Sequence, residues 1–125
     1  MDKKKKYILV VEDDVFLAKI YKTKLSKEGF ELSLAHDGEE ALAQIKQRKP
    51  DMILLDLMMP KKDGFEVMEE LAKDPECKKI PIIILSNLGQ ESDVERGLAL
   101  GAKDYFVKAN VSLNEIIKKI TKHIK

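Results

Sequence analysis

Apolar residues gather in short, nearly continuous runs at regular intervals along the chain. Three runs, YILVV (7–11), MILLD (52–56) and IPIIIL (80–85), are too continuous for strands with one face in water. We interpret them as strands covered on both faces, the usual condition of a parallel sheet. ELSLA (31–35) and DYFVK (104–108) are weaker candidates of the same kind. The pattern therefore predicts five strands.

The segments between these runs repeat apolar residues at helical spacing, so each is expected to bury one stripe. The stripes are Leu17, Ile20, Tyr21 and Leu25; Ala41, Leu42 and Ile45; Val67, Met68, Leu71 and Ala72; and Leu113, Ile116, Ile117, Ile120 and Ile124. Pairs with capping-box spacing mark helix starts: Asp37 with Glu40, Asp63 with Glu66, Ser92 with Glu95, and Ser112 with Glu115. The stretch 91–100 has few apolar positions and a central Gly97, which costs about 1 kcal/mol relative to alanine. We expect the least stable helix there.

Strand and helix alternate along the whole chain. Such alternation predicts an α/β fold, in which a five-stranded parallel sheet has helices on both faces, because each crossover returns the chain to the same edge of the sheet. A length of 125 residues matches one ordinary domain. We therefore assign residues 1–125 to a single domain.

Charge and cysteine content narrow the possible functions. The formal net charge is +1, so we expect no overall field that draws the protein to nucleic acid or to an anionic membrane. Cys77 is the only cysteine, which excludes an internal disulfide, and every apolar run is shorter than a membrane span or signal-peptide core. The expected compartment is the cytoplasm.

Residues directly after the apolar runs carry the candidate chemistry, because ligands of open parallel sheets bind beyond the carboxyl ends of the strands. These residues are Glu12 and Asp13 after the first run, Asp56 after the third, Ser86 after the fourth and Lys108 after the fifth. Converging carboxylates repel one another unless their pKa values rise or a cation neutralises them. Oxygen donors without histidine or cysteine favour Mg²⁺ over zinc. A lysine and a hydroxyl across the crevice would suit a phosphate held against the metal.

The segments ILVVEDD, LLDLMMPKKDG, ILSN and DYFVK resemble the strand ends of a response-regulator receiver domain, of the chemotaxis-type single-domain kind, from Lys6 to Ile124. The resemblance implies a flavodoxin-like sheet of strand order 2-1-3-4-5. It also implies Mg²⁺ as cofactor and a histidine kinase or phosphotransfer protein as phosphodonor. The implied roles are phosphoacceptor for Asp56; direct Mg²⁺ ligand for Asp13, Asp56 and the Met58 backbone carbonyl; water-mediated ligand for Glu12; phosphoryl contact for Ser86 and Lys108; and switch for Ser86 and Tyr105.

Phosphoryl transfer to a carboxylate depends mostly on positioning and on neutralising charge, which the implied metal and Lys108 would supply. The domain would act as a phosphorylation switch in two-component signalling and not as a turnover enzyme. We expect its signal to pass through the fourth helix, fifth strand and fifth helix to a downstream protein or a missing output domain. Direct binding of nucleic acid or membrane by this chain is not expected. Met58 and Leu88, two places after Asp56 and Ser86, predict a long-lived phosphoryl state, because apolar side chains neither orient water nor leave it much room.

Each of these residues alone also fits an ordinary structural role. Glu12 and Asp13 suit the first turn of a helix, Ser86 a turn, Lys108 a solvated strand end and Tyr105 strand packing. Only their joint placement at successive strand ends favours a functional role over these structural ones. We interpret His36 and His123 as surface residues.

The loop after Lys108 departs from the family pattern. Many receivers have a proline at the next position, preceded by a cis bond, whereas this chain has Ala109. A cis bond before alanine costs about 2.5–4 kcal/mol relative to trans. The loop therefore either stores this strain or follows a trans path in which other contacts position Lys108.

Three other functions share part of the pattern. An aspartate-nucleophile phosphatase requires a second aspartate two residues after the nucleophile, where this chain has Met58. A flavodoxin-like or nucleotide-binding module requires a glycine- or hydroxyl-rich turn after the first strand, where this chain has EDDVF. A degenerate receiver that acts as a phosphorylation-independent interaction module is the third alternative.

Overall fold

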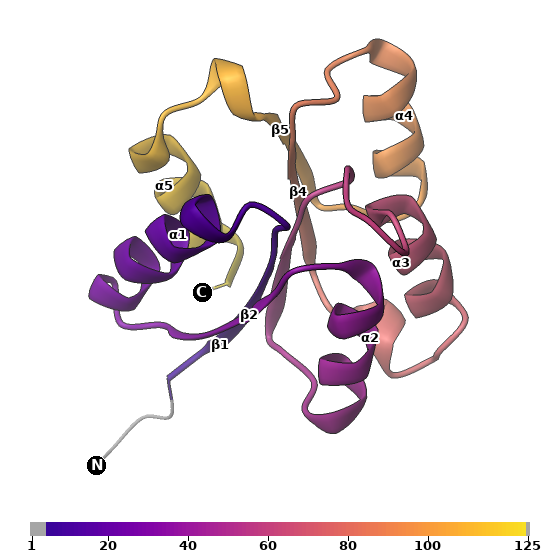
Figure 1. Ribbon diagram of the computed structural model, residues 1–125, viewed down its shortest axis with the longest axis horizontal. Helices are drawn as coiled ribbons and strands as arrows, with labels where there is room; N and C mark the ends of the chain where they lie inside the picture. Colours follow the sequence, from indigo (N-terminus) through magenta and orange to yellow (C-terminus); the bar gives the residue numbers. More distant parts are fainter. Residues whose placement is uncertain (1–4, 125) are drawn as a thin grey trace.

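The computed structural model describes residues 5–124, which form one parallel sheet with helices on both faces (Figure 1). The five strands lie in the order β2-β1-β3-β4-β5, which confirms the expected topology. In chain order the elements are β1 (Tyr7–Val11), α1 (Val15–Lys27), β2 (Glu31–Ala35), α2 (Gly38–Gln47), β3 (Met52–Leu55), α3 (Gly64–Ala72), η1 (Cys77–Lys79), β4 (Ile82–Ser86), α4 (Glu91–Ala99), β5 (Asp104–Val107), η2 (Lys108–Asn110) and α5 (Leu113–Ile124).

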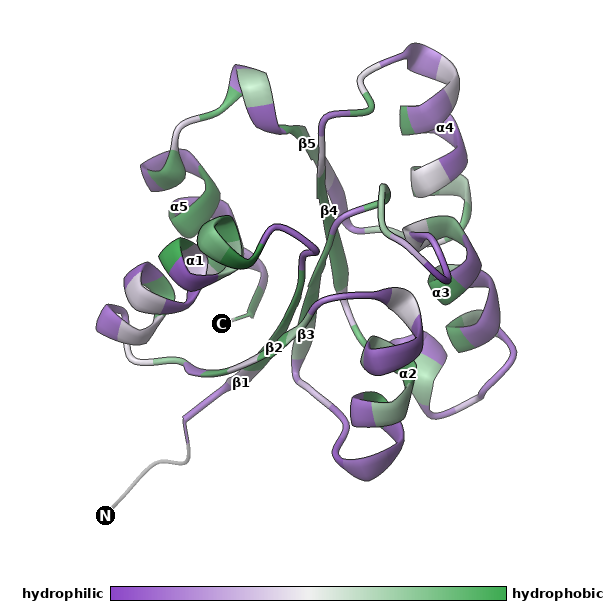
Figure 2. Cartoon of the chain, in the orientation of Figure 1, coloured by the Kyte–Doolittle hydropathy of each residue, from purple (hydrophilic) through white to green (hydrophobic). Residues whose placement is uncertain are grey.

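Alternate side chains of the central strands enter two apolar cores, one on each face of the sheet. On one face Ile8, Val10 and Leu54 pack with residues of α1 and α5, which lie together in Figure 1. On the other face Leu9 and Ile53 pack with residues of α2 and α3. Strands β1, β3 and β4 are buried along their whole length, and Figure 2 shows them as the apolar centre of the molecule. The edge strands β2 and β5, which have the weaker apolar runs in the sequence, are less buried.

Two predicted capping boxes form in full. At the start of α3 the Asp63 carboxylate accepts from the Glu66 amide at 2.8 Å, and the Glu66 carboxylate accepts from the Asp63 amide at 3.1 Å. Ser112 and Glu115 form the same reciprocal pair at the start of α5. These bonds satisfy backbone groups that have no partner inside the helix.

The predicted capping box of Ser92 and Glu95 is wrong. Helix α4 begins at Glu91, and its cap residue Gln90 forms no side-chain hydrogen bond within the described chain. The amide of Val94 already donates to the Gln90 carbonyl at 3.1 Å, so Ser92 lies inside the first turn. Acidic side chains in that turn complement the helix dipole instead.

Gly97 has a packing role that the sequence did not indicate. A Cβ added there would lie 2.6 Å from Cδ1 of Ile84 and 3.1 Å from the ring of Tyr105. The absent side chain lets α4 approach β4 and β5 closely. The conformational cost of a glycine in the helix is therefore offset by contact with the sheet.

Candidate functional site

The carboxyl ends of β1, β3 and β5 bring predicted site residues into one cleft. The pairing of β1 with β3 places Val11 opposite Leu55, so the next residues, Glu12 and Asp56, leave neighbouring strands at the same level. The cleft has a volume of about 370 Å³ and is lined by Glu12, Asp13, Asp14, Leu17, Asp56, Met58, Asn87 and Lys108. Sheet register therefore accounts for the convergence of residues that are far apart in sequence.

Glu12, Asp13 and Asp56 form an acidic cluster in this cleft, with one carboxylate oxygen from each within 4.8 Å of the others. Glu12 and Asp56 are only 2% and 5% exposed, whereas Asp13 is exposed. Burial raises the pKa of Glu12 to about 7, although its hydrogen bond to Lys108 acts in the opposite direction. The cluster thus concentrates negative charge where water screens it poorly.

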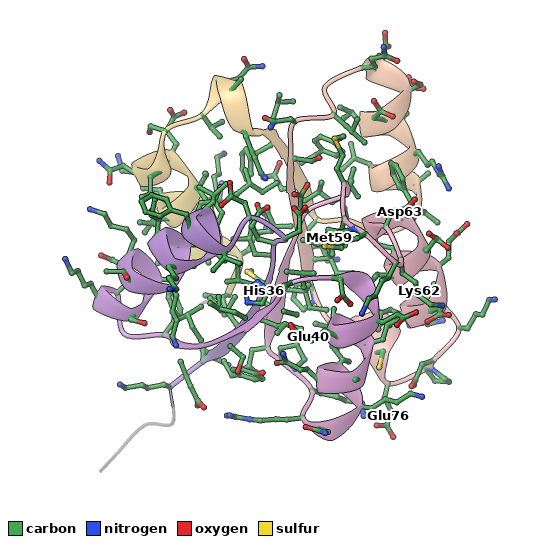
Figure 3. The ribbon with its side chains drawn as sticks, in the orientation of Figure 1. His36, Glu40, Met59, Lys62, Asp63 and Glu76 are labelled. Atoms are coloured by element: carbon green, nitrogen blue, oxygen red, sulfur yellow. The ribbon has the colours of Figure 1, made fainter. Side chains whose placement is uncertain are left out.

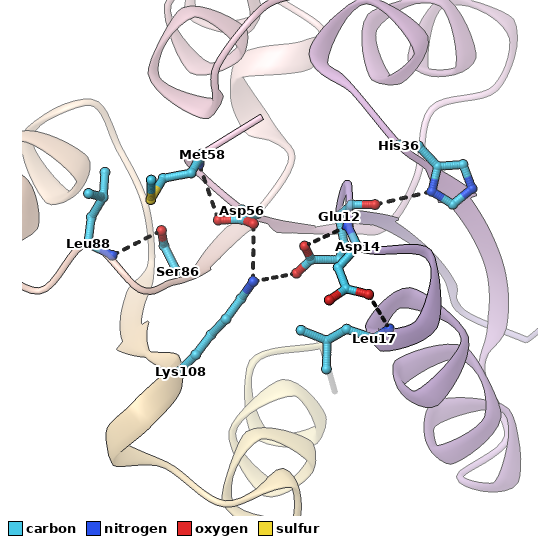
Figure 4. Close-up of polar contacts among 9 residues, drawn as sticks. All are labelled: Glu12, Asp14, Leu17, His36, Asp56, Met58, Ser86, Leu88 and Lys108. Carbon is cyan, nitrogen blue, oxygen red and sulfur yellow. Dashed lines mark hydrogen bonds and ion pairs between the residues drawn. The ribbon is translucent and has the colours of Figure 1, made fainter. Parts of the chain in front are cut away.

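Lys108 reaches across the cleft and binds two members of the acidic cluster (Figure 4). Its ammonium nitrogen lies 2.6 Å from Oε1 of Glu12 and 3.1 Å from Oδ2 of Asp56. Burial by itself lowers the pKa of Lys108, but the hydrogen bond to Glu12 and the charge of Asp56 outweigh it and raise the pKa. The ammonium therefore stays charged and partly neutralises both buried carboxylates.

The loop that carries Lys108 follows the trans path, the second of the two alternatives predicted from the sequence. Every peptide bond within residues 5–124 is trans, including the one before Ala109. Residues Lys108–Asn110 form a short 3-10 turn that begins directly after β5. The direction of β5 and this turn together position the ammonium, so the departure from the family's proline does not displace Lys108 from Asp56.

Asp56 is also held by the loop that follows it. Its Oδ1 atom accepts a hydrogen bond from the amide of Met58 at 3.2 Å, while Oδ2 faces Lys108. The side chain of Met58 is 55% exposed at the mouth of the cleft. The expected role of the Met58 carbonyl as a metal ligand stays a prediction.

Ser86 and Tyr105 both contact the loop between β4 and α4. The Ser86 hydroxyl, fully buried, accepts a hydrogen bond from the Leu88 amide at 3.3 Å. The Tyr105 hydroxyl donates to the Leu88 carbonyl. Asn87 lines the cleft in place of Ser86, so the phosphoryl contact predicted for Ser86 stays a prediction.

Two residues near the site were missed or misjudged in the sequence. Asn87 lines the cleft, and its position directly after the last residue of β4 was a signal that could have identified it. His36 was interpreted as a surface residue, yet it is half-buried and its Nδ1 atom lies 3.1 Å from the carbonyl oxygen of Glu12. No local sequence pattern indicates that contact. His123 lies 3.3 Å from Asp104, away from the cleft.

The donor set of the acidic cluster fits a hard divalent cation. It offers carboxylate oxygens alone, and its three acidic side chains outnumber the one ammonium, that of Lys108, that binds the cluster. Glu12, Asp13 and Asp56 are the residues that would hold the ion. Fold and site together define the class: a parallel α/β domain with an acidic cluster and a lysine at the carboxyl edge of its sheet.

Comparison with known proteins identifies the family within this class. The family model described as "Response regulator receiver domain" matches residues 8–121. The ycf27 protein of Cyanophora paradoxa, whose name assigns it to transcriptional regulation, is 47% identical over 108 residues, which are 86% of this chain and 44% of that protein. The chain belongs to the response regulator receiver family, and this membership supports a phosphoacceptor role in two-component signalling.

Solved structures of the family have the same fold. The Francisella response regulator 1452 receiver domain has a TM-score of 0.87 and 35% identity, over 96% of this chain and 99% of that one. The Mn²⁺-bound form of response regulator Rcp1 has a TM-score of 0.81 and 32% identity, over 94% and 90% of the two chains. A divalent cation is thus bound in a relative of the same fold.

The chain spans less than half the length of the curated relatives that it matches. Their full activities therefore extend to this protein only as proposals. Within residues 5–124, every helix is too short or too polar to cross a lipid bilayer.

Proposed function

We propose that this protein is a phosphorylation switch whose acceptor is Asp56. The observation that carries the proposal is the position of this buried carboxylate, which lies within 4.8 Å of two other acidic side chains and 3.1 Å from the Lys108 ammonium. Lys108 offsets the charge of this nucleophile, and the acidic cluster would hold a cation that offsets the charge of an incoming phosphoryl group.

In the proposed reaction, an Asp56 oxygen attacks the phosphorus of a phosphohistidine on a histidine kinase or phosphotransfer protein. The P–N bond breaks, its electron pair stays on the ring nitrogen, which takes a proton from water, and Asp56 becomes an acyl phosphate. Asp13, Asp56 and the Met58 carbonyl would hold Mg²⁺ directly and Glu12 would hold it through water, and the ion would supply positive charge for the phosphoryl oxygens. Lys108 would keep its contact with the modified Asp56 and stabilise the same charge from the other side.

The proposed protein is a switch and not a turnover enzyme, because its own side chain is the phosphoryl acceptor and must lose the group before it can react again. Its proposed setting is the cytoplasm, as the single cysteine predicted. A downstream protein or an output domain would read the modified state, and this chain would bind no nucleic acid directly.

The proposed signalling surface comprises α4, β5 and α5. Ser86 lies at the end of β4 and contacts the Leu88 amide, while Tyr105 of β5 contacts the Leu88 carbonyl. A phosphoryl group that recruits the Ser86 hydroxyl would compete with the first of these bonds. Helix α4 follows this loop without a side-chain cap, so it can shift at low cost.

The rival functions have weaker support. A phosphatase of the aspartate-nucleophile type would require an acid where Met58 lies exposed. A degenerate interaction module would not require Lys108 to reach both Glu12 and Asp56, as it does. Both arguments favour the phosphoacceptor.

The proposal is tested by incubating the protein with Mg²⁺ and acetyl phosphate and measuring its intact mass, beside an Asp56→Asn control. Gain of one phosphoryl group that requires both Mg²⁺ and Asp56 is the expected result. No gain in a folded protein would overturn the proposal and favour the degenerate interaction module.

A further inference from the structure

The corner between β2 and α2, residues 36–38, contacts the turn that carries Glu12 and Asp13 (Figure 4). The Nδ1 atom of His36 lies 3.1 Å from the carbonyl oxygen of Glu12. A carbonyl can only accept, so this ring nitrogen carries the proton and donates. The backbone of His36 is itself held, because its amide donates to the carboxylate of Glu40 at 2.7 Å.

This hydrogen bond extends the pairing of β1 with β2 beyond the ends of both strands. The ladder ends at Val11 and Ala35, and the Glu12 amide still donates to the Ala35 carbonyl at 2.9 Å. The ring of His36 then donates to the backbone carbonyl of Glu12. Both backbone groups of Glu12 are thus held by consecutive residues of one neighbouring segment.

The same corner abuts the loop that follows Asp56. A Cβ added to Gly38 would lie 2.2 Å from the carbonyl oxygen of Lys62, so only a glycine allows this approach. The Asp37 carboxylate lies 3.7 Å from the ammonium of Lys61, which is largely exposed, so the pair contributes little by itself. Figure 3 shows His36 at the corner and Lys62 on the neighbouring loop. The corner therefore lies against both loops that carry the acidic cluster.

We propose that His36 is a positioning residue that sets the divalent-cation affinity of the acidic cluster. The Glu12 carbonyl and the Asp13 amide belong to one planar peptide unit. A hydrogen bond to that carbonyl therefore restrains the rotation that directs both side chains into the cleft. Partners that orient the ligands of a metal commonly affect its affinity. This inference rests on the proposed function, because it assumes that the cluster binds Mg²⁺.

Three variants test the role of His36. His36→Asn retains a nitrogen donor the same number of bonds from the backbone as Nδ1, whereas His36→Leu keeps comparable bulk without a donor. His123→Leu is the matched control, since His123 contacts Asp104 away from the cleft. Urea unfolding of each variant establishes that it is folded, and His36→Ala replaces the leucine variant if that one does not fold.

Mg²⁺ affinity is measured by calorimetry on the whole chain. We expect His36→Leu to bind Mg²⁺ about two- to tenfold more weakly than the unsubstituted protein, the range for one lost hydrogen bond. His36→Asn and His123→Leu should keep the original affinity within about twofold. The rate of phosphorylation by acetyl phosphate at saturating Mg²⁺ should be unchanged in all of them, because His36 touches no reacting atom. A general structural defect would lower that rate as well.

The outcomes separate this inference from the proposed function. If the unsubstituted protein does not bind Mg²⁺, the proposed function fails. If it binds Mg²⁺ and the folded leucine or alanine variant binds equally well, only the role of His36 is refuted. An asparagine variant as weak as the leucine variant would also overturn the inference.

Discussion

Replacement of Lys108 by methionine removes the cation between two buried carboxylates and keeps the length of the side chain. In the native protein Lys108 lies 2.6 Å from Glu12 and 3.1 Å from Asp56, and its side chain is 15% exposed. Removing one partner of a buried ion pair typically costs about 3–5 kcal/mol. Glu12 can relieve part of this cost by taking up a proton, since its pKa is already about 7. We therefore expect a loss of about 3 kcal/mol, the lower end of that range.

That loss corresponds to a measurable fall in melting temperature. For a chain of 125 residues, an unfolding entropy of about 2.1 cal/mol/K per residue gives a shift of about 4 °C for each kcal/mol. Lys108→Met should therefore unfold about 12 °C lower than the unsubstituted protein in EDTA. Far-UV circular dichroism measures both transitions. Lys22→Met, on the exposed face of α1, is the control and should change stability by less than about 0.5 kcal/mol.

Mg²⁺ provides the decisive comparison. The ammonium of Lys108 lies beside Glu12 and Asp56, which would also hold a divalent cation, so the two positive charges repel one another. Mg²⁺ should therefore raise the melting temperature of Lys108→Met by more than it raises that of the unsubstituted protein. Two results would refute the reasoning that Lys108 neutralises the acidic cluster. One is a decrease in melting temperature of less than about 4 °C in EDTA, and the other is an equal rise in melting temperature on adding Mg²⁺ to both proteins.

Three further predictions follow from individual contacts. Met58→Asn should shorten the lifetime of the phosphorylated protein by about two- to tenfold, because an amide at the mouth of the cleft can orient water; an unchanged or slower loss of ³²P would contradict this. Gly64→Ala should lower stability by about 1–3 kcal/mol in urea unfolding despite the better helix propensity of alanine, since the new Cβ would lie 2.4 Å from the Asp56 carbonyl oxygen; unchanged stability would show that α3 can move away. Burial and the neighbouring Asp74 raise the pKa of the Cys77 thiol, so iodoacetamide at pH 8 should modify the folded protein much more slowly than the urea-unfolded protein, and equal rates would be inconsistent with that environment.

Features that depend on local pattern could be predicted from the sequence alone. Continuous apolar runs identified the buried strands, because strands covered on both faces have no polar side to alternate with. The residues after those runs, Glu12, Asp13, Asp56 and Lys108, could then be assigned to one edge, since parallel strands all end at the same edge of a sheet. The strand order came from the family resemblance and not from the residues themselves.

Features that depend on packing between distant segments could not be predicted in this way. Lys108 meets Glu12 from 96 positions away, and His36 meets the same residue through a carbonyl that no side-chain pattern reveals. Gly97 suggested a weak helix, which stays a prediction, but its close approach to Ile84 had no signal in the sequence. Side-chain periodicity determines which residues are buried and where each strand ends, but the distance between two such ends depends on register, twist and the fit of whole elements. The sequence by itself thus determined which residues gather at the edge of the sheet, and only the tertiary structure decided which atoms touch.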